Sequence, residues 1–363
     1  MRRSYQSIAY PTLITFGMSD LIAQAVQTLR SGNLVAIPTE TVYGLAADAS
    51  NPLAINKVFS TKGRPAGHPL IVHIANPVSE QSTEEEQGKL WGHALSLWAR
   101  DVPSQALLLA QAFWPGPLTM ILPKAKSVLP EITGGQETVG IRCPNHPIAL
   151  ELLKKFEGGL AAPSANKFGH VSPTTAEHVE DEFPGLLVLD GGSCQVGIES
   201  TIVDLTRLDS VGPVILRPGA ISKEQIDRVL GLSDLTDRVG ETSMTNIPRV
   251  SGSLSAHYAP KTKLLTYHKG LDFQNQMINS GHHIAWVHFD TDEVLPVEIS
   301  KAQCVEYVIP KTPVEFAKTL YATLRSLDKD HYDLIIFPEL PSGSAWDAVR
   351  DRLSRAVVGS GVV

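Results

Sequence analysis

A short cationic segment, residues 61–70, carries the side chains of this chain best suited to chemistry. Lys62 and Arg64 stand on either side of a glycine. Pro65 and Pro69 favour extended or turn backbone, and in an extended segment residues two apart project to the same side. Two cations placed in this way can hold one polyanion. The spacing therefore predicts a phosphate-binding site, with an ordinary solvated loop as the alternative.

A second segment, 162–170, has complementary chemistry. Ser164 and Asn166 repeat the two-residue spacing and offer a hydroxyl and an amide group. Gly169 lets a ligand approach the backbone closely. The two segments together predict one polar anion site, although either alone is also typical of a plain surface turn.

The elements that must position these segments begin with an apolar run at 34–37, which predicts a strand. This run breaks into a polar turn at 38–45, and the ends of strands in open α/β sheets are where ligand groups gather. The same patterns predict strands at 70–74, 119–122, 138–142, 159–161, 186–189 and 200–205, and helices at 20–29 after a Ser19 cap, at 84–112 with a break at Pro103, and at 148–156.

The pattern changes at 231–255, where Thr, Ser, Asn, Gly and Pro predominate and predict a linker. Beyond it, apolar runs alternate with helical segments, which indicates a parallel sheet with crossover helices. The expected strands are 263–267, 284–289, 305–309 and 333–337, and the expected helices are 314–327 and 345–357. We expect a catalytic domain over 1–240, an interdomain linker over 241–262 and a C-terminal α/β domain over 263–363.

Composition narrows the class of protein. A chain of 363 residues with 43% hydrophobic residues can bury two cores, and a net charge of −7 argues against a broad basic face for nucleic acid. Cys143, Cys194 and Cys304 form no Cys-x-x-Cys pair, so neither a disulfide framework nor a zinc site is predicted. No run approaches the roughly 20 apolar residues of a membrane span. We expect a cytoplasmic protein, with an organelle as the alternative because the first eight residues are basic.

Several strings along the chain carry a resemblance to a known family. They are 37–45 (IPTETVYGL), 62–65 (KGRP), 69–74 (PLIVHI), 114–119 (WPGPLT), 162–166 (APSAN), 200–204 (STIVD) and 217–219 (RPG). The chain resembles the YrdC-like family, in the long two-domain form of the L-threonylcarbamoyladenylate synthases. The resemblance implies a twisted mixed-sheet α/β catalytic domain followed by a smaller parallel-sheet, Rossmann-like α/β domain.

The resemblance also implies a reaction. L-threonine, bicarbonate or CO2, and ATP condense to threonylcarbamoyl-AMP with release of pyrophosphate, and the product feeds the threonylcarbamoyladenosine modification of tRNA. Mg2+ is expected to accompany ATP, without identified protein ligands. Downstream tRNA-modifying proteins are possible partners, and direct tRNA binding stays open. Every reacting partner except the amine is anionic, so positioning and cationic stabilisation are expected to dominate over a protein nucleophile.

The resemblance assigns residues to two groups. Lys62 and Arg64 are expected to hold the triphosphate and act in catalysis, and the nucleotide site is completed by His68, Thr138, Ser164, Asn166, Ser172, Arg217 and Tyr258. The family commonly carries Asn where this chain has His68, so a turn histidine is an equal alternative there. Substrate contacts are expected from Thr41, His73, Arg142, Ala162, Ser200 and Thr201, with Arg142 as the carboxylate clamp. A core histidine is the alternative for His73, and a surface salt bridge is the alternative for Arg142.

The interdomain segment 251–260 is expected to cover the site. Gly252 gives it freedom to swing, and His257 and Tyr258 give it an aromatic tip that can meet a nucleotide. On this hypothesis an alanine at Tyr258 lowers activity without changing stability, whereas a passive tether is the alternative.

Two other functions stay open from the sequence. One is a double-stranded-RNA or ribosome-associated binding module that uses the same basic cleft, and the other is a carbamoyltransferase relative. The acidic net charge opposes the first, and the missing acylphosphatase and zinc-finger regions oppose the second. Calorimetry separates the first from a synthase, because a synthase binds ATP and L-threonine together.

Overall fold

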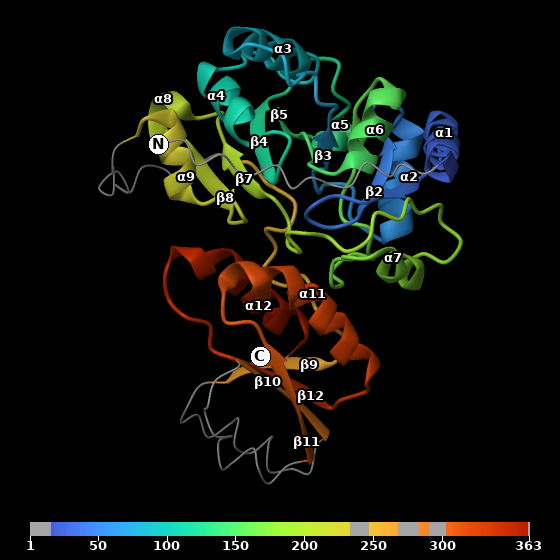
Figure 1. Ribbon diagram of the computed structural model, residues 1–363, viewed down its shortest axis with the longest axis vertical. Coiled ribbons are helices and arrows are strands. Elements are labelled where there is room, and N and C mark those ends of the chain that lie inside the picture. Colours follow the sequence, from blue (N-terminus) through green and yellow to red (C-terminus); the bar gives the residue numbers. More distant parts are fainter. Residues whose placement is uncertain (1–15, 233–246, 268–282, 290–302, 362–363) are drawn as a thin grey trace.

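The structure is a computed structural model that describes residues 16–232, 247–267, 283–289 and 303–361 (Figure 1). The basic start of the chain and residues 233–246 of the expected linker lie outside this part. No helix of the described residues is long and apolar enough to cross a membrane.

The larger part of the molecule is built on an eight-stranded mixed sheet. Its strand order is β1-β2-β6-β3-β5-β4-β7-β8, with β3–β5 and β4–β7 parallel and the other pairs antiparallel. The strands are β1 (Val35–Ile37), β2 (Gly44–Asp48), β3 (Ile71–His73), β4 (Leu118–Pro123), β5 (Thr138–Arg142), β6 (Leu160–Ala161), β7 (Thr201–Asp204) and β8 (Val214–Arg217).

Helices pack on both faces of this sheet, and its strands are therefore buried on both sides. Along β1, Val35 and Ile37 join the cluster formed by α1 and α6, whereas Ala36 joins the cluster on the opposite face, which includes α2, α3 and α4. The helices are α1 (Phe16–Arg30), α2 (Pro52–Lys62), α3 (Glu84–Ser96), α4 (Ser104–Phe113), α5 (Pro130–Thr133), α6 (Pro147–Phe156), α7 (Ala176–Glu182), α8 (Leu208–Val211) and α9 (Lys223–Leu230).

The smaller part contains a four-stranded parallel sheet of order β11-β10-β12-β9. Two helices cover one of its faces, where they bury Leu264, Val287 and Phe337 together with Phe316 and Leu353. The strands are β9 (Lys263–Tyr267), β10 (His283–Phe289), β11 (Gln303–Ile309) and β12 (Leu334–Pro338), and the helices are α11 (Pro313–Lys329), the short 3-10 turn η2 (Ser344–Trp346) and α12 (Asp347–Gly359).

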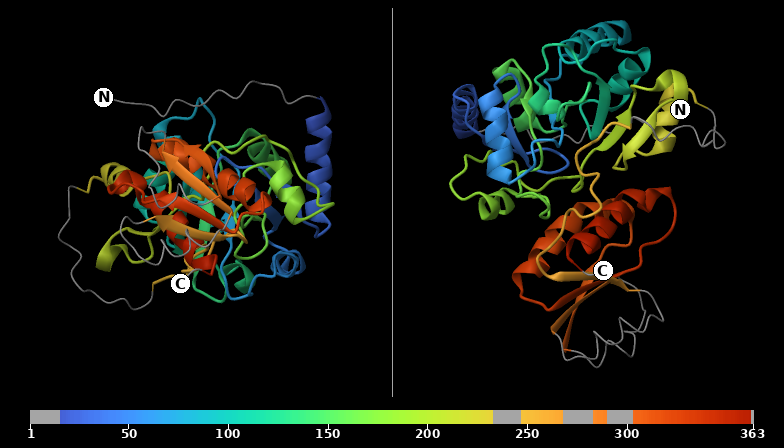
Figure 2. Two further views of the ribbon diagram at one scale, coloured as in Figure 1. Left: turned by 90° about the horizontal axis from the view of Figure 1, so that it is seen from below. Right: turned by 180° about the vertical axis from the view of Figure 1, so that it is seen from behind.

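Helices α11 and α12 lie between the two sheets (Figures 1 and 2). Their apolar cluster also takes in Val42, Val171 and Ile198 of the larger part and Tyr258 of the connecting segment. The two parts therefore share a core, and the helices of the smaller part reach the residues around Val42 and Ile198.

The expected fold class is confirmed, since a mixed sheet is followed by a smaller parallel sheet. Three expected elements differ in detail from the observed ones. Helix α1 is already formed at Phe16, so Ser19 does not cap it. The helix that begins at Glu84 ends at Ser96, and a second helix begins at Ser104 directly after Pro103, so the expected break is confirmed but is wider than one residue. Residues 186–189 form only one isolated parallel bridge, from Val188 to Ala36 of β1.

Candidate active site

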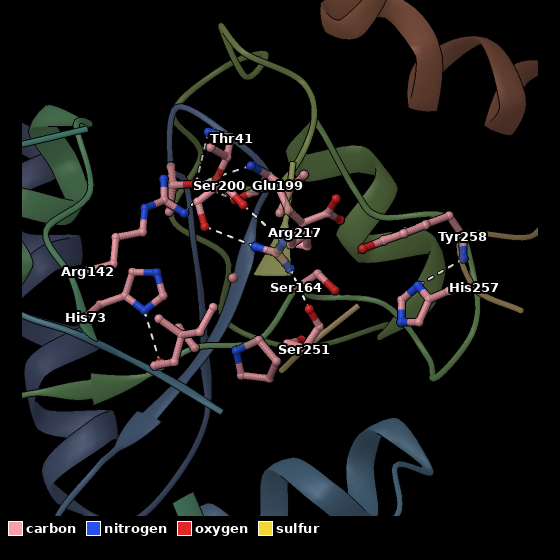
Figure 3. Close-up of a pocket in the computed structure, with 16 residues that line it drawn as sticks. Thr41, His73, Arg142, Ser164, Glu199, Ser200, Arg217, Ser251, His257 and Tyr258 are labelled. Atoms are coloured by element: carbon pink, nitrogen blue, oxygen red, sulfur yellow. Dashed lines mark hydrogen bonds between the residues drawn. The ribbon is translucent and has the colours of Figure 1, made fainter. Parts of the chain in front are cut away.

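A small cavity of about 40 Å3 lies where the polar turn after β1, the ends of β3 and β5, the start of β7 and the connecting segment meet (Figure 3). It is large enough for a small molecule or a few waters. Its lining residues are Thr39, Thr41, Val42, Gly44, Ile71, His73, Arg142, Ala162, Pro163, Ser164, Glu199, Ser200, Arg217, Ser251, His257 and Tyr258.

Arg142, the last residue of β5, forms one wall of the cavity. Its Nη1 donates to Thr41 Oγ1 at 2.9 Å, its Nε donates to the Gly116 carbonyl at 3.3 Å, and its Nη2 lies 2.8 Å from Glu40 Oε1. The guanidinium is only 4% exposed, so these contacts fix its orientation in a poorly solvated place. The alternative role expected for Arg142 was a surface salt bridge. Arg142 does pair with Glu40, but this pair is buried beside the cavity.

His73 ends β3 beside Arg142, and it is buried. Its Nδ1 lies 3.3 Å from the Ile71 carbonyl. Burial, followed by repulsion from Arg142, lowers the pKa of the His73 imidazole to about 3. His73 therefore presents a neutral ring to the cavity at physiological pH.

Arg217, at the end of β8, organises the opposite wall. Its Nε and Nη2 donate to the carbonyl and Oγ of Ser200, both at 3.0 Å, and its Nη1 donates to the Ser251 carbonyl at 2.9 Å. Ser200 Oγ also lies 2.8 Å from Thr119 Oγ1. One arginine thus ties the start of β7 to the connecting segment.

Lys62 is the last residue of α2 and does not lie in an extended segment, which corrects the expected backbone. Gly63 has φ of 62° and its N–H binds the carbonyls of Phe59 and Ser60, so a glycine in the left-handed region ends the helix. Pro65 follows this cap rather than preventing the helix. Lys62 Nζ donates to the Ser164 carbonyl at 2.6 Å and to the Asn166 carbonyl.

The ammonium of Lys62 is held in an unusual setting. The residue is 2% exposed, and burial followed by repulsion from Arg64 lowers its pKa well below the usual range. Both of its hydrogen-bond partners are neutral carbonyls. A nearby anion would stabilise its charged form strongly in so poorly solvated a place.

Arg64 follows the cap and turns toward the connecting segment. Its Nη2 donates to the Pro69 carbonyl at 3.0 Å and to Ser251 Oγ at 3.4 Å, and Phe168 lies under the guanidinium at 5.9 Å. Burial lowers the pKa of Arg64 to about 10, so it stays a cation. Lys62 and Arg64 therefore both contact residues that line the cavity, although the end of helix α2 lies between them in the chain.

The connecting segment supplies the lid of the cavity through Ser251, His257 and Tyr258. Tyr258 is 1% exposed and stacks on Tyr321 of α11 at 5.5 Å, yet its buried hydroxyl has no hydrogen-bond partner among the described residues. Burial raises the pKa of this hydroxyl to about 12. Tyr258 is therefore a core residue, and the expectation that an alanine there leaves stability unchanged is wrong.

Eight of the expected site residues line the cavity: Thr41, His73, Arg142, Ala162, Ser164, Ser200, Arg217 and Tyr258. Lys62 and Arg64 bind lining residues from behind. Five others do not line it, namely His68, Thr138, Asn166, Ser172 and Thr201.

The five outlying residues have other partners. The hydroxyl of Thr201 donates to the Ile221 carbonyl at 2.7 Å, and that of Ser172 donates to Glu199 at 2.6 Å. The amide of Asn166 donates to the carbonyls of Lys167 and His170, which leaves its buried Oδ1 without a partner in the described part.

The remaining two lie at the margins of the site. His68 packs its ring against Phe168 at 5.3 Å. Thr138 lines a second, smaller hollow together with Gln136, Arg249 and Ser251. Since Ser251 borders both spaces, this hollow adjoins the first cavity under the connecting segment.

Sequence reasoning missed Thr39 and Glu199. Thr39 accepts hydrogen bonds from the N–H groups of Thr41 and Val42 and so shapes the turn that presents Thr41. Glu199 directly precedes Ser200 and is paired with Arg352 of α12 at 2.9 Å. Thr39 lies within the string 37–45 and could have been found from it. Glu199 could not, because its partner Arg352 belongs to the smaller part of the molecule and nothing near Glu199 in the chain indicates the pair.

The cavity offers little to a metal ion. Among the described residues no group of three His, Cys, Asp or Glu side chains is placed to bind one. The two carboxylates nearest the cavity, Glu40 and Glu199, are each paired with an arginine. We derive no step through a protein-bound metal.

Comparisons with known proteins agree with this geometry. Residues 27–219 match the family model of the Sua5, YciO and YrdC proteins, described as "Telomere recombination", and residues 221–357 match the model described as "Threonylcarbamoyl-AMP synthase, C-terminal domain". The threonylcarbamoyl-AMP synthase of Pyrococcus abyssi is 36% identical over 90% of this chain and 91% of its own, and that of Bacillus subtilis is 38% identical over 93% of each. The crystal structure of the P. abyssi Sua5 protein complexed with L-threonine covers 93% of this chain and 94% of its own, with 34% identity and a TM-score of 0.74.

Proposed function

The chain belongs to the Sua5/YciO/YrdC family in its long form with the threonylcarbamoyl-AMP synthase C-terminal domain, and from this we propose how its cavity performs that synthesis. L-threonine, bicarbonate or CO2, and ATP give threonylcarbamoyl-AMP and pyrophosphate. The free amino group of threonine first adds to CO2 and loses a proton, or condenses with bicarbonate and loses water, to give a carbamate. A carbamate oxygen then attacks the α-phosphorus of ATP, and pyrophosphate leaves.

Arg142 binds the carboxylate of threonine in this proposal. Two of its five N–H groups are used by Gly116 and Thr41, and Nη2 is paired with Glu40 by charge without a hydrogen bond, so N–H groups on both terminal nitrogens are left for the substrate. The hydroxyls of Thr41 and Ser200 lie on the cavity wall and suit the polar groups of an amino acid. The solved P. abyssi relative holds L-threonine, which supports this choice of substrate.

Lys62, Arg64 and Arg217 bind the triphosphate and stabilise charge on the α-phosphate and the leaving pyrophosphate. Their partners in this structure are almost all carbonyls and hydroxyls, so an arriving phosphate exchanges neutral acceptors for a charged one. The Ser164 hydroxyl lies on the cavity wall and can donate to a phosphate oxygen, and Asn166 completes the site by holding Lys62 through its backbone carbonyl. Mg2+ is expected to enter with ATP, with the phosphates as its ligands.

The neutral His73 ring keeps an extra cation away from the amine of threonine. An uncharged imidazole at this place does not repel a substrate ammonium, and the adjacent Arg142 is left to face the carboxylate. Partners downstream of the product and the cytoplasmic location stay predictions from the sequence.

One observation carries the proposal: the cations Lys62, Arg64, Arg142 and Arg217 converge on one cavity rimmed by hydroxyl groups. The decisive experiment is mass detection of threonylcarbamoyl-AMP after incubation with ATP, bicarbonate and L-threonine. We expect product and an equal amount of pyrophosphate, and neither when threonine is omitted. A folded protein that gives no product with all three substrates would remove this function.

A further inference from the structure

The buried carboxylate of Glu199, on the wall of the cavity, is held mainly by the smaller part of the molecule. Tyr321 of α11 donates its hydroxyl to Glu199 Oε2 at 2.8 Å, and Arg352 of α12 donates its Nε to the same oxygen at 2.9 Å. Ser172 occupies the other oxygen at 2.6 Å. Both oxygens of Glu199 thus have hydrogen-bond partners, and Arg217 is a second cation close enough to attract the carboxylate.

We propose that Arg352 and Tyr321 are positioning residues for the synthase site, and that they make the C-terminal part necessary for ATP binding. They hold Glu199 so that its charge is neutralised by Arg352 and Arg217 stays available for phosphate. This inference rests on the proposed role of Arg217 in the nucleotide site.

The same two residues also hold the lid. The Arg352 guanidinium lies 5.4 Å from the centre of the Tyr258 ring, and the Tyr321 ring stacks on the Tyr258 ring at 5.5 Å. Arg352 Nη2 donates to the Pro218 carbonyl at 3.0 Å, directly after Arg217. A single side chain of α12 therefore contacts Glu199, the lid and the strand end that carries Arg217.

Arg352 compensates the negative charge of the buried Glu199 carboxylate. Burial by itself raises the pKa of Glu199, but attraction to Arg352 and Arg217 and the Ser172 hydrogen bond bring it to about 2, so the carboxylate is ionised. Arg352 is completely buried and also pairs with Asp351 at 2.6 Å. Without Arg352, Glu199 is an uncompensated anion at the cavity wall that competes for Arg217 and repels a triphosphate.

The test compares four variants by their KM for ATP and their kcat in pyrophosphate release. Tyr321→Phe removes one donor to Glu199 and keeps the ring, and we expect KM for ATP to rise roughly three- to tenfold, the size of one hydrogen bond. Arg352→Met is expected to raise it roughly ten- to a hundredfold. Arg352→Lys, which restores a charge, should lie between Arg352→Met and wild type.

The fourth variant distinguishes positioning from mere folding. In Glu199→Gln/Arg352→Met the unpaired carboxylate is gone, so most of the lost ATP affinity should return even though the ion pair is absent. Matched controls are Tyr332→Phe, whose hydroxyl hydrogen-bonds to that of Tyr307 within the smaller part, and Arg350→Met on the same helix as Arg352. Both controls should keep the wild-type KM.

An unchanged KM for ATP in Tyr321→Phe and Arg352→Lys, with both proteins folded, would overturn the inference even if Arg352→Met fails to fold. A double variant no better than Arg352→Met would also overturn it, because a purely structural defect is not relieved by neutralising Glu199. If wild-type protein makes no product, the proposed function fails instead, and calorimetric ATP binding by the same variants decides the inference separately.

Discussion

Replacing Tyr258 by phenylalanine should separate the binding role of its hydroxyl from the packing role of its ring. The ring is buried against Tyr321 and Arg352, and Phe keeps that packing. The hydroxyl is buried without a partner among the described residues, a situation that costs about 1–3 kcal/mol. Tyr258→Phe should therefore leave the free energy of unfolding unchanged or raise it by up to that amount.

The same variant should bind ATP less well. If the free hydroxyl meets a phosphate, its loss removes a charge-assisted hydrogen bond of about 1.5–3 kcal/mol, or roughly ten- to 150-fold in Kd. Urea unfolding and calorimetry with ATP in the presence of L-threonine measure the two effects. A destabilised variant with wild-type ATP affinity would refute the reasoning, because the hydroxyl would then serve the fold. Tyr258→Ala is the contrasting variant and should lose stability, since a fully buried aromatic ring is removed.

Three further outcomes are expected. Arg64→Ala removes charge-assisted contacts of about 1.5–3 kcal/mol each, so the rate of pyrophosphate release should fall roughly ten- to several-hundred-fold. The control Arg228→Ala, at an exposed position on α9, should leave this rate unchanged. A near-wild-type rate in Arg64→Ala would exclude Arg64 from the site. If Arg142 clamps the carboxylate, serine should react less well than threonine by about 1–3 kcal/mol and the decarboxylated amine should fail; equal turnover of threonine and that amine contradicts the clamp. His73 and His257 both have pKa values of about 3 in the fold, below the unfolded value, so their contribution is complete above about pH 6.5 and is lost on acidification. Unfolding free energy should fall by about 2 kcal/mol from pH 7 to 5.5, and less in His257→Gln; a flat profile would show that these rings do not stay neutral.

The apolar strands could be predicted because each carries its own signal. The runs that become β3, β5 and β9 are short, β-branched and bounded by polar residues, and they appear within a residue or two of the expected places. Helix α2 was missed because prolines flank it and its apolar face is weak. The Asn51 cap, which binds the N–H groups of Leu53 and Ala54, and Gly63 at its other end fix its limits instead.

The residues of the site could be predicted where a motif places polar groups beside a strand end. Thr41, Arg142 and Ser200 are of this kind, and all three line the cavity. Thr201 lies next to Ser200 in the chain, but alternation along β7 turns its hydroxyl to Ile221. Glu199 and Arg352 could not be found, because their pairing depends on how the two parts of the molecule meet.

The position of β4 in the large sheet has a consequence for the order in which the protein folds. β4 lies between β5, which carries Arg142, and β7, which is preceded by Ser200, and it pairs in parallel with β7 from Leu118↔Thr201 to Ile121↔Asp204. Parallel pairing across a long stretch of chain carries a large loop-closure entropy and forms slowly, whereas a helix with a capping box such as α3 forms locally and early. A refolding chain should therefore regain most of its helical circular dichroism in a fast phase, and its ability to bind threonine only in the last and slowest one.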